Sequence, residues 1–153
     1  MTRVHVPIAL RWSDLDAYGH VNNARMLTLL EEARIEVFWP GRSALAEPLP
    51  ELHMDDGTLS LIARQEVEYL LPVPHLRDPL DIQLWLGAIG GASLEVCYEV
   101  HGPTGTDDDV LYARAATTIV MVDAASGRPR RISERERALW LPFHEPPLEF
   151  RRR

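Results

Sequence analysis

Five segments of the chain alternate apolar and polar residues with a period of two, and this pattern limits the fold more than any other feature. They lie at residues 4–12, 61–71, 80–86, 94–100 and 110–122. Strict alternation is typical of a strand with one buried face. Strands of parallel sheets are buried on both faces and read as continuous apolar runs instead. The pattern therefore predicts one antiparallel sheet of five strands.

One segment has helical periodicity. Between Asn23 and Phe38 the apolar residues recur at helical spacing, and polar residues occupy the opposite side. The apolar stripe consists of Met26, Leu29, Leu30, Ala33 and Val37. Pro40-Gly41 follows as a stop signal. The order β-α-β-β-β-β gives an α+β class, in which the helix most simply buries its stripe against the concave face of the sheet.

The chain is long enough for one domain. Its 153 residues, 46% hydrophobic and 25% charged, match an ordinary globular domain. We expect a single domain over residues 1–141 and a loosely held C-terminal tail over 142–153. Within the domain, residues 40–58 read as a loop, Gly90-Gly91 as a hairpin turn and Ser133 to Glu136 as the capped start of a short helix.

Composition excludes several classes of partner. The 23 acidic residues outnumber the 16 basic ones, all of them arginine, and the net charge of −7 argues against nucleic acid. No apolar run approaches the roughly 20 residues of a membrane span. Cys97 is the single cysteine and the histidines are scattered, so we expect neither a disulfide nor a metal or cofactor site. The N-terminal residues enter a strand without a signal-peptide pattern, which favours a cytoplasmic protein.

Polar residues that can carry chemistry crowd into the loop before the helix. Asp14, Asp16, His20, Asn22 and Asn23 all lie there. A helix start exposes backbone N–H groups and a partial positive charge, so a carboxylate beside it suits acyl transfer. The same residues also fit a structural role, with the aspartates as turn formers and Asn22 as the N-cap.

The string Asp14-Leu15-Asp16-Ala17-Tyr18-Gly19-His20-Val21-Asn22-Asn23-Ala24-Arg25, continued by Leu29 to Arg34, resembles the signature of hotdog-fold acyl-CoA thioesterases. It is similar to the 4-hydroxybenzoyl-CoA thioesterase family and most closely to its long-chain acyl-CoA thioesterase branch. Weaker likeness at residues 67–72 and 123–129 extends the resemblance over roughly residues 4 to 132. It implies a hotdog fold, in which an antiparallel sheet wraps around the long helix.

The resemblance implies roles for single residues. Asp16 matches the aspartate that acts as nucleophile or as general base for water, and the backbone N–H near Asn23 would polarise the thioester carbonyl. His20 stands where benzoyl-type members carry a hydrophobic residue, which leaves its role open. We expect His20 and Asn22 to orient Asp16 and the substrate carbonyl. A helix glutamate serves some relatives, so Glu31 is a minor candidate, whereas Cys97 has no activating base nearby in the pattern.

Hydrolysis of acyl-CoA to a free acid and CoA is the leading hypothesis, with a homodimer or homotetramer that admits substrate at the subunit boundary. Arg128 and Arg130, in the densest arginine cluster outside the tail, are candidates for the CoA phosphates, although a solvated turn explains them equally well. An acyl-carrier-protein thioesterase and a non-catalytic acyl-CoA-binding dimer stay open as alternatives. A hotdog hydratase is excluded, because it needs an aspartate where this chain has Leu15.

Overall fold

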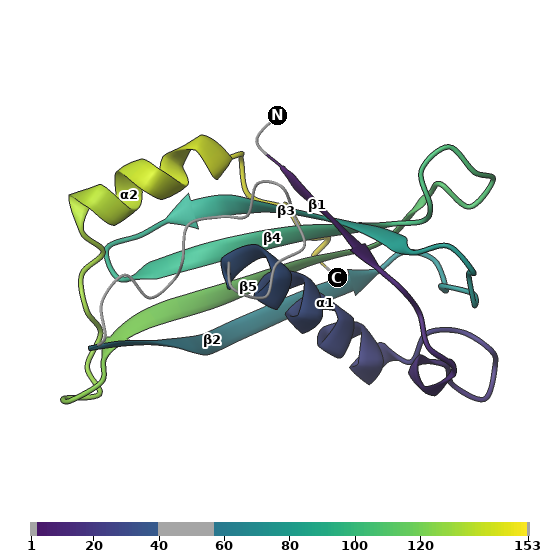
Figure 1. Cartoon of the computed structure of the whole chain (residues 1–153), viewed down its shortest axis with the longest axis horizontal. Helices are drawn as coiled ribbons and strands as arrows, with labels where there is room; N and C mark the ends of the chain where they lie inside the picture. Colours follow the sequence, from purple (N-terminus) through teal and green to yellow (C-terminus); the bar gives the residue numbers. More distant parts are fainter. Residues whose placement is uncertain (1–2, 40–56, 153) are drawn as a thin grey trace.

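The computed structural model describes residues 3–39 and 57–152, which form one antiparallel sheet with a helix across it (Figure 1). The strands lie in the order β1-β3-β4-β5-β2, and α1 (Asn23–Phe38) follows β1 in the chain. The strand bounds are Val4–Ile8 for β1, Thr58–Tyr69 for β2, Leu80–Ile89 for β3, Ser93–His101 for β4 and Leu111–Asp123 for β5. Two 3-10 turns, η1 (Trp12–Asp14) and η2 (Leu141–Phe143), and helix α2 (Glu134–Trp140) complete the described elements. The predicted α+β class and element order are confirmed.

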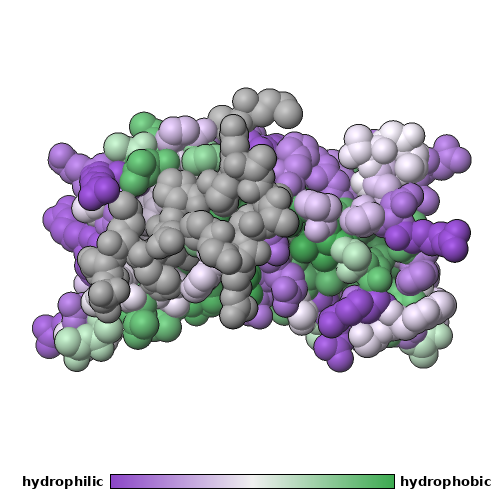
Figure 2. Space-filling model, in the orientation of Figure 1, coloured by the Kyte–Doolittle hydropathy of each residue, from purple (hydrophilic) through white to green (hydrophobic). Residues whose placement is uncertain are grey.

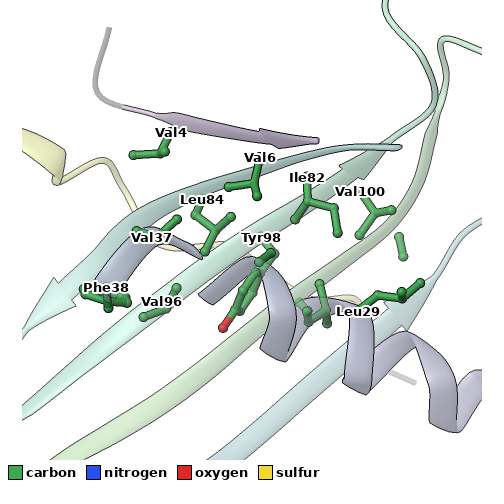
Figure 3. Packing of buried hydrophobic residues seen from close by; sticks show 14 of the residues in the cluster. Val4, Val6, Leu29, Val37, Phe38, Ile82, Leu84, Val96, Tyr98 and Val100 are labelled. Carbon is green, nitrogen blue, oxygen red and sulfur yellow. The ribbon is translucent and has the colours of Figure 1, made fainter. Parts of the chain in front are cut away.

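The predicted stripe of α1 is buried. Its five apolar residues are each at most 3% exposed. Figure 3 shows Leu29, Val37 and Phe38 facing strand residues such as Leu84 and Tyr98 across the core. Because side chains on one face of each strand meet this stripe, the sheet and α1 share one hydrophobic core. A long helix held against a five-stranded antiparallel sheet is the hotdog arrangement that the resemblance implies.

Strand β2 contains a bulge that the sequence pattern did not reveal. Its register against β5 shifts between Ile62 and Arg64. Leu61 pairs with Val120 while Val67 pairs with Ala115, and these two β5 residues point to opposite faces. The strict alternation expected over residues 61–71, which would put Leu61 and Val67 on one face, was therefore wrong, since one extra residue changes the facing of the strand midway.

The C-terminal tail is bound to the sheet, so the expectation that it is loosely held was wrong. The backbone N–H of Glu145 donates to the Leu86 carbonyl, and the Trp85 indole donates to the Pro146 carbonyl. Farther along, the backbone N–H of Arg151 donates to Glu68. These contacts hold residues 145–151 across the outer face of β3, β4, β5 and β2, the face opposite α1.

Local signals for turns and caps agree with the structure. Gly90 and Gly91 lie in the turn between β3 and β4, and Ser133 and Glu136 form the predicted capping box at the start of α2. Most of the loop predicted over residues 40–58, including Pro40-Gly41, lies outside the described residues. Within the described residues, no helix combines the length and the apolar character that crossing a bilayer requires.

Candidate active site

The start of α1 has a free backbone donor. Asn22 is the N-cap, and its side-chain oxygen accepts hydrogen bonds from the backbone N–H groups of Ala24, at 2.9 Å, and Arg25, at 3.4 Å. The N–H of Asn23 has no acceptor among the described residues. Asn22 is therefore the N-cap, as predicted. The adjacent N–H of Asn23 can donate a hydrogen bond to a ligand.

The loop before the helix closes on itself as a tight turn. Leu15 and Val21 form a bridge, and the N–H of Asn22 donates to the Asp14 carbonyl at 2.8 Å. Gly19 adopts a φ of 78°, a left-handed conformation that glycine tolerates without strain. Asp16 pairs with His20 nearer the tip of this turn, since its N–H donates to the His20 carbonyl, and it precedes Asn23 by seven residues.

The two aspartates of the loop have different environments. Asp14 is fully buried, and its carboxylate accepts bonds from the Arg11 backbone N–H at 2.8 Å and from the Arg11 guanidinium at 3.0 Å. Burial tends to raise the pKa of Asp14, but these bonds outweigh it and hold that pKa below its ordinary value. Asp14 thus serves as an internal anchor for the loop.

Asp16 keeps one carboxylate oxygen available. Its Oδ1 accepts from the backbone N–H groups of Tyr18, at 2.8 Å, and His20, at 3.2 Å. No described residue donates to its Oδ2. Oδ1 therefore has the predicted role of a turn former. Oδ2 can accept a proton from water or attack a carbonyl carbon.

His20 takes part in the loop through its backbone. Its carbonyl accepts a hydrogen bond from the Asp16 N–H at 2.7 Å. The backbone of His20 also forms an isolated antiparallel β-bridge with Pro74, on the segment after β2. Its imidazole has no hydrogen-bond partner among the described residues. On the same segment His75 stacks on Trp12, with ring centroids 4.6 Å apart.

An apolar cavity of about 260 Å³ opens beside the helix start. It is lined by Val21 and Met26 from the helix side and by residues 69–73 from the end of β2 onward. On the face that carries α1, hydrophobic residues gather to the right of the centre of the view, and hydrophilic residues surround them (Figure 2). The cavity is thus an apolar surface that includes Tyr69, whose hydroxyl contacts Asn23 at the helix start.

Tyr69 is a site residue that the sequence pattern placed only on a strand face. Its hydroxyl donates a 2.8 Å hydrogen bond to the Asn23 carbonyl, and its ring lines the cavity. Partial burial raises the pKa of the Tyr69 phenol, so it stays a donor at neutral pH. A hydroxyl-bearing residue at the end of an otherwise apolar strand face is the signal that could have identified it.

The minor candidates fall into structural roles. The Glu31 side chain is 59% exposed and lies 3.8 Å from Arg34, which binds the buried Tyr98 hydroxyl. Cys97 is buried, and desolvation raises the pKa of its thiol to about 12, so it is not a thiolate at neutral pH. Within residues 3–39 and 57–152, no three His, Cys, Asp or Glu side chains form a metal-binding group.

The arginines predicted to meet CoA lie far from the helix start of their own chain. Arg128 follows β5, whose last residue Asp123 pairs with Thr58, whereas the helix start contacts Tyr69 at the other end of β2. Eleven residues of strand separate these ends, about 36 Å. The guanidinium of Arg130 is also held by Glu136 through two hydrogen bonds of 2.8 and 2.9 Å.

Comparison with known proteins gives a consistent picture. The model for the family described as the Thioesterase-like superfamily matches residues 10–139. A thioesterase from Thermus thermophilus, solved with coenzyme A and zinc, is 27% identical with a TM-score of 0.65, and the match covers 92% of each chain.

A predicted thioesterase from Bacillus stearothermophilus has a TM-score of 0.73 over 95% of this chain and 98% of that one, at 24% identity, which supports the fold alone. The uncharacterized protein YsmA of Bacillus subtilis is 29% identical over 91 residues. That match covers 60% of this chain and 56% of YsmA, little more than half of the relative's length.

Proposed function

Because the chain belongs to the Thioesterase-like superfamily, we propose that it hydrolyses acyl-CoA thioesters to a free acid and CoA, with Asp16 as the reacting carboxylate. Family membership and the named thioesterases among its structural relatives identify a thioester hydrolase. The observation that supports the finer proposal is that the loop before the helix keeps one Asp16 carboxylate oxygen without a donor among the described residues, while the Asn23 N–H at the helix start has no acceptor among them.

The proposed reaction uses both groups. With the thioester carbonyl oxygen at the Asn23 N–H, negative charge that develops on that oxygen meets a backbone donor and the positive end of α1. Asp16 takes a proton from a water molecule while the water oxygen bonds to the carbonyl carbon. The C–S bond then breaks, and the departing thiolate of CoA takes up the proton.

A second route uses the same residues. Asp16 attacks the carbonyl carbon directly, the CoA thiolate leaves, and water cleaves the resulting acyl anhydride. Both routes need an ionised Asp16 and the Asn23 donor. Asn22 keeps the helix start in place as its cap, and His20 fixes the Asp16 turn, so we assign both to positioning.

Coenzyme A is the proposed carrier of the acyl group, since the Thermus thermophilus relative was solved with coenzyme A. The apolar cavity beside the helix start suits an aliphatic acyl chain, and this is consistent with the long-chain branch that the loop sequence resembles. Acyl-carrier protein is the alternative carrier, and a non-catalytic acyl-CoA-binding dimer is the alternative class.

We also propose a homodimer formed along β2. This edge strand pairs with β5 on one side and with no described strand on the other. Its first half exposes Leu59, Leu61 and Ile62, between 45% and 52% each. An unpaired edge with exposed apolar residues is a common interface between copies.

Such a dimer affects the arginine prediction. Antiparallel pairing of two β2 edges about a two-fold axis brings the Thr58 end of one strand toward the Tyr69 end of the other. Arg128 of the partner subunit then approaches the helix start, so its proposed phosphate contact depends on the dimer. Arg130, held by Glu136, contributes mainly to the position of α2.

The decisive experiment follows thiol release from a panel of acyl-CoA esters, from short to long and aromatic, with a thiol reagent. Hydrolysis that is lost in Asp16→Asn supports the proposal. Binding without thiol release supports the non-catalytic alternative. Faster hydrolysis of the same acyl group on acyl-carrier protein than on CoA identifies the other carrier.

A further inference from the structure

The loop before α1 has two limbs, and the limb that returns to the helix, residues 20–22, is held by backbone contacts. The N–H of Val21 donates to the Val73 carbonyl at 2.8 Å, and the backbone of His20 forms a bridge with Pro74. Both partners belong to residues 70–79, which connect β2 to β3. The loop and this connection lie together at the right-hand end of the view (Figure 1). Because these contacts are made by the backbone, side-chain substitutions leave them in place.

The limb that leads to Asp16, residues 12–16, meets the same connection through two rings. Trp12 stacks on His75, with ring centroids 4.6 Å apart and an angle of 7° between the ring planes. Trp12 also begins the turn η1, since its carbonyl accepts from the Leu15 N–H at 3.2 Å. Asp16 follows Leu15 directly. The stack is therefore made four residues before the proposed reacting carboxylate, on the same limb of the loop.

The stacked rings are exposed, so burial does not explain their contact. Trp12 is 77% exposed, and His75 is exposed as well. An indole in solvent contributes little to the hydrophobic core, which depends on apolar area removed from water. The hydrogen bonds of Asp14 stay within the loop, because its carboxylate is bound by Arg11 and its carbonyl by the Asn22 N–H. The stack ties this limb to the connection, which the bonds of Asp14 do not.

The connection also forms one wall of the apolar cavity beside the helix start. Residues 70–73 line that cavity, together with Tyr69 at the end of β2. His75 follows two residues after Val73. A ring stacked on His75 thus sets the position of the limb before Asp16 relative to the wall on which the acyl group is proposed to lie.

We propose that Trp12 and His75 are positioning residues, whose stacked rings hold the limb that carries Asp16 against the cavity wall and so place its carboxylate for the reaction. This inference rests on the proposed function, in which Asp16 is the reacting carboxylate. The indole and the imidazole act through the backbone of residues 12–16 and transfer no proton, so another flat ring can replace either of them. The stack works in the same way beneath a partner subunit, because it does not depend on solvent.

The kinetic test separates the stack from the chemistry of its rings. Trp12→Ala and His75→Ala should each lower kcat about tenfold, or about 1.4 kcal/mol, the upper end of what a stacked pair contributes. KM for acyl-CoA should change less than about twofold, since residues 69–73 stay in place. The double variant should lose no more than either single one, because the two rings make one contact. Trp12→Phe and His75→Phe keep two flat rings and should retain about half of the wild-type kcat or more.

Trp39→Ala is the matched control. Trp39 is an indole at the opposite end of α1, and it is 40% exposed. Its replacement removes a ring of the same size without touching the loop, so kcat and KM should stay at the wild-type values.

Hydrogen exchange separates this inference from the proposed function. Amide exchange over residues 13–22 should be faster in Trp12→Ala and His75→Ala than in the wild type and in Trp39→Ala, while exchange in β3 and β4 stays the same. This readout needs no turnover, so faster exchange supports the role of the stack even in a protein that hydrolyses no thioester. Unchanged exchange in both alanine variants, a lower melting temperature with unchanged kcat, or a kcat of His75→Phe as low as that of His75→Ala would each overturn the inference.

Discussion

The hydroxyl of Tyr69, at the end of β2, donates a 2.8 Å hydrogen bond to the backbone carbonyl of Asn23, at the start of α1. The bond ties the edge strand to the residue whose N–H is the proposed oxyanion donor. The position of that N–H therefore depends on β2 as well as on the loop before the helix.

Replacing Tyr69 by Phe tests this tie. The variant loses one hydrogen bond, so we expect a loss of about 1 kcal/mol in the free energy of unfolding and a lower kcat, because the Asn23 donor is less firmly placed. Thermal unfolding and steady-state kinetics measure the two effects. Tyr18→Phe is the control, because Tyr18 is 85% exposed. A Tyr69→Phe enzyme with unchanged kcat would show that the tie is structural only.

Asp16→Asn removes the proposed reacting carboxylate. We expect kcat to fall about 100-fold or more while the circular dichroism spectrum and the melting temperature stay close to those of the wild type, since the amide oxygen can still accept the turn hydrogen bonds. The contrasting variant is Asp14→Asn. It leaves the Arg11 guanidinium without its buried counter-charge and should mainly lower stability. Near-normal turnover in Asp16→Asn rules out the assignment.

His20→Ala should lower kcat less than Asp16→Asn does. The imidazole has no partner among the described residues, and the hydrogen bonds of the turn to His20 are made by its backbone, which alanine retains. Parallel measurement of kcat and kcat/KM for both variants decides the point. An equal or larger loss in His20→Ala would assign the imidazole a direct part in the reaction.

The Arg130–Glu136 pair should make stability depend on pH in the acid range. Hydrogen bonds from Arg130, opposed by burial, lower the pKa of Glu136 from 4.5 to about 2. A carboxylate whose pKa is lower in the folded state stabilises above its unfolded pKa and loses that effect as pH falls through the folded value. Glu136→Gln should therefore be destabilised at pH 7, by about 3 kcal/mol at most, and the difference should shrink between pH 4.5 and about 2. Denaturant unfolding across this pH range measures it, and a difference that is constant with pH contradicts the prediction.

Leu61→Glu should disrupt the proposed dimer. The substitution puts a charge in the middle of the exposed apolar half of β2, where a second copy would bury it. Light scattering should give a dimer mass for the wild type and a monomer mass for the variant, with activity lost alongside. Leu141→Glu is the control, since Leu141 is 59% exposed on η2. A wild-type protein that is an active monomer would exclude the dimer.

Helix α1 could be predicted to the residue because its signals are local. The stripe from Met26 to Val37 and the Asn22 cap lie within a few turns of one another, and nothing distant alters them. The course of the C-terminal tail could not be predicted in this way. It depends on the fit of Glu145 against Leu86 and of Arg151 against Glu68, contacts between residues far apart in the chain.

The sequence pattern singled out the loop residues but could not distinguish the environments of its two aspartates. Asp14 and Asp16 are the same residue type two positions apart, and only the reach of Arg11 makes one of them an anchor. The part of Tyr69 was missed because a strand pattern gives the face of a side chain and not the atom that its hydroxyl meets.

The bulge in β2 also has a consequence for how this chain is aligned with others. Thr58, Ser60 and Ile62 share the inner face with Gln65, Val67 and Tyr69 because Ala63 is the extra residue between the two halves. Removing Ala63 alone would leave every other side chain of the strand facing as it does now. A sequence alignment without gaps inside strands would shift half of β2 by one residue against a relative that lacks the bulge. A single gap at Ala63 keeps the inward-facing positions of the two strands matched.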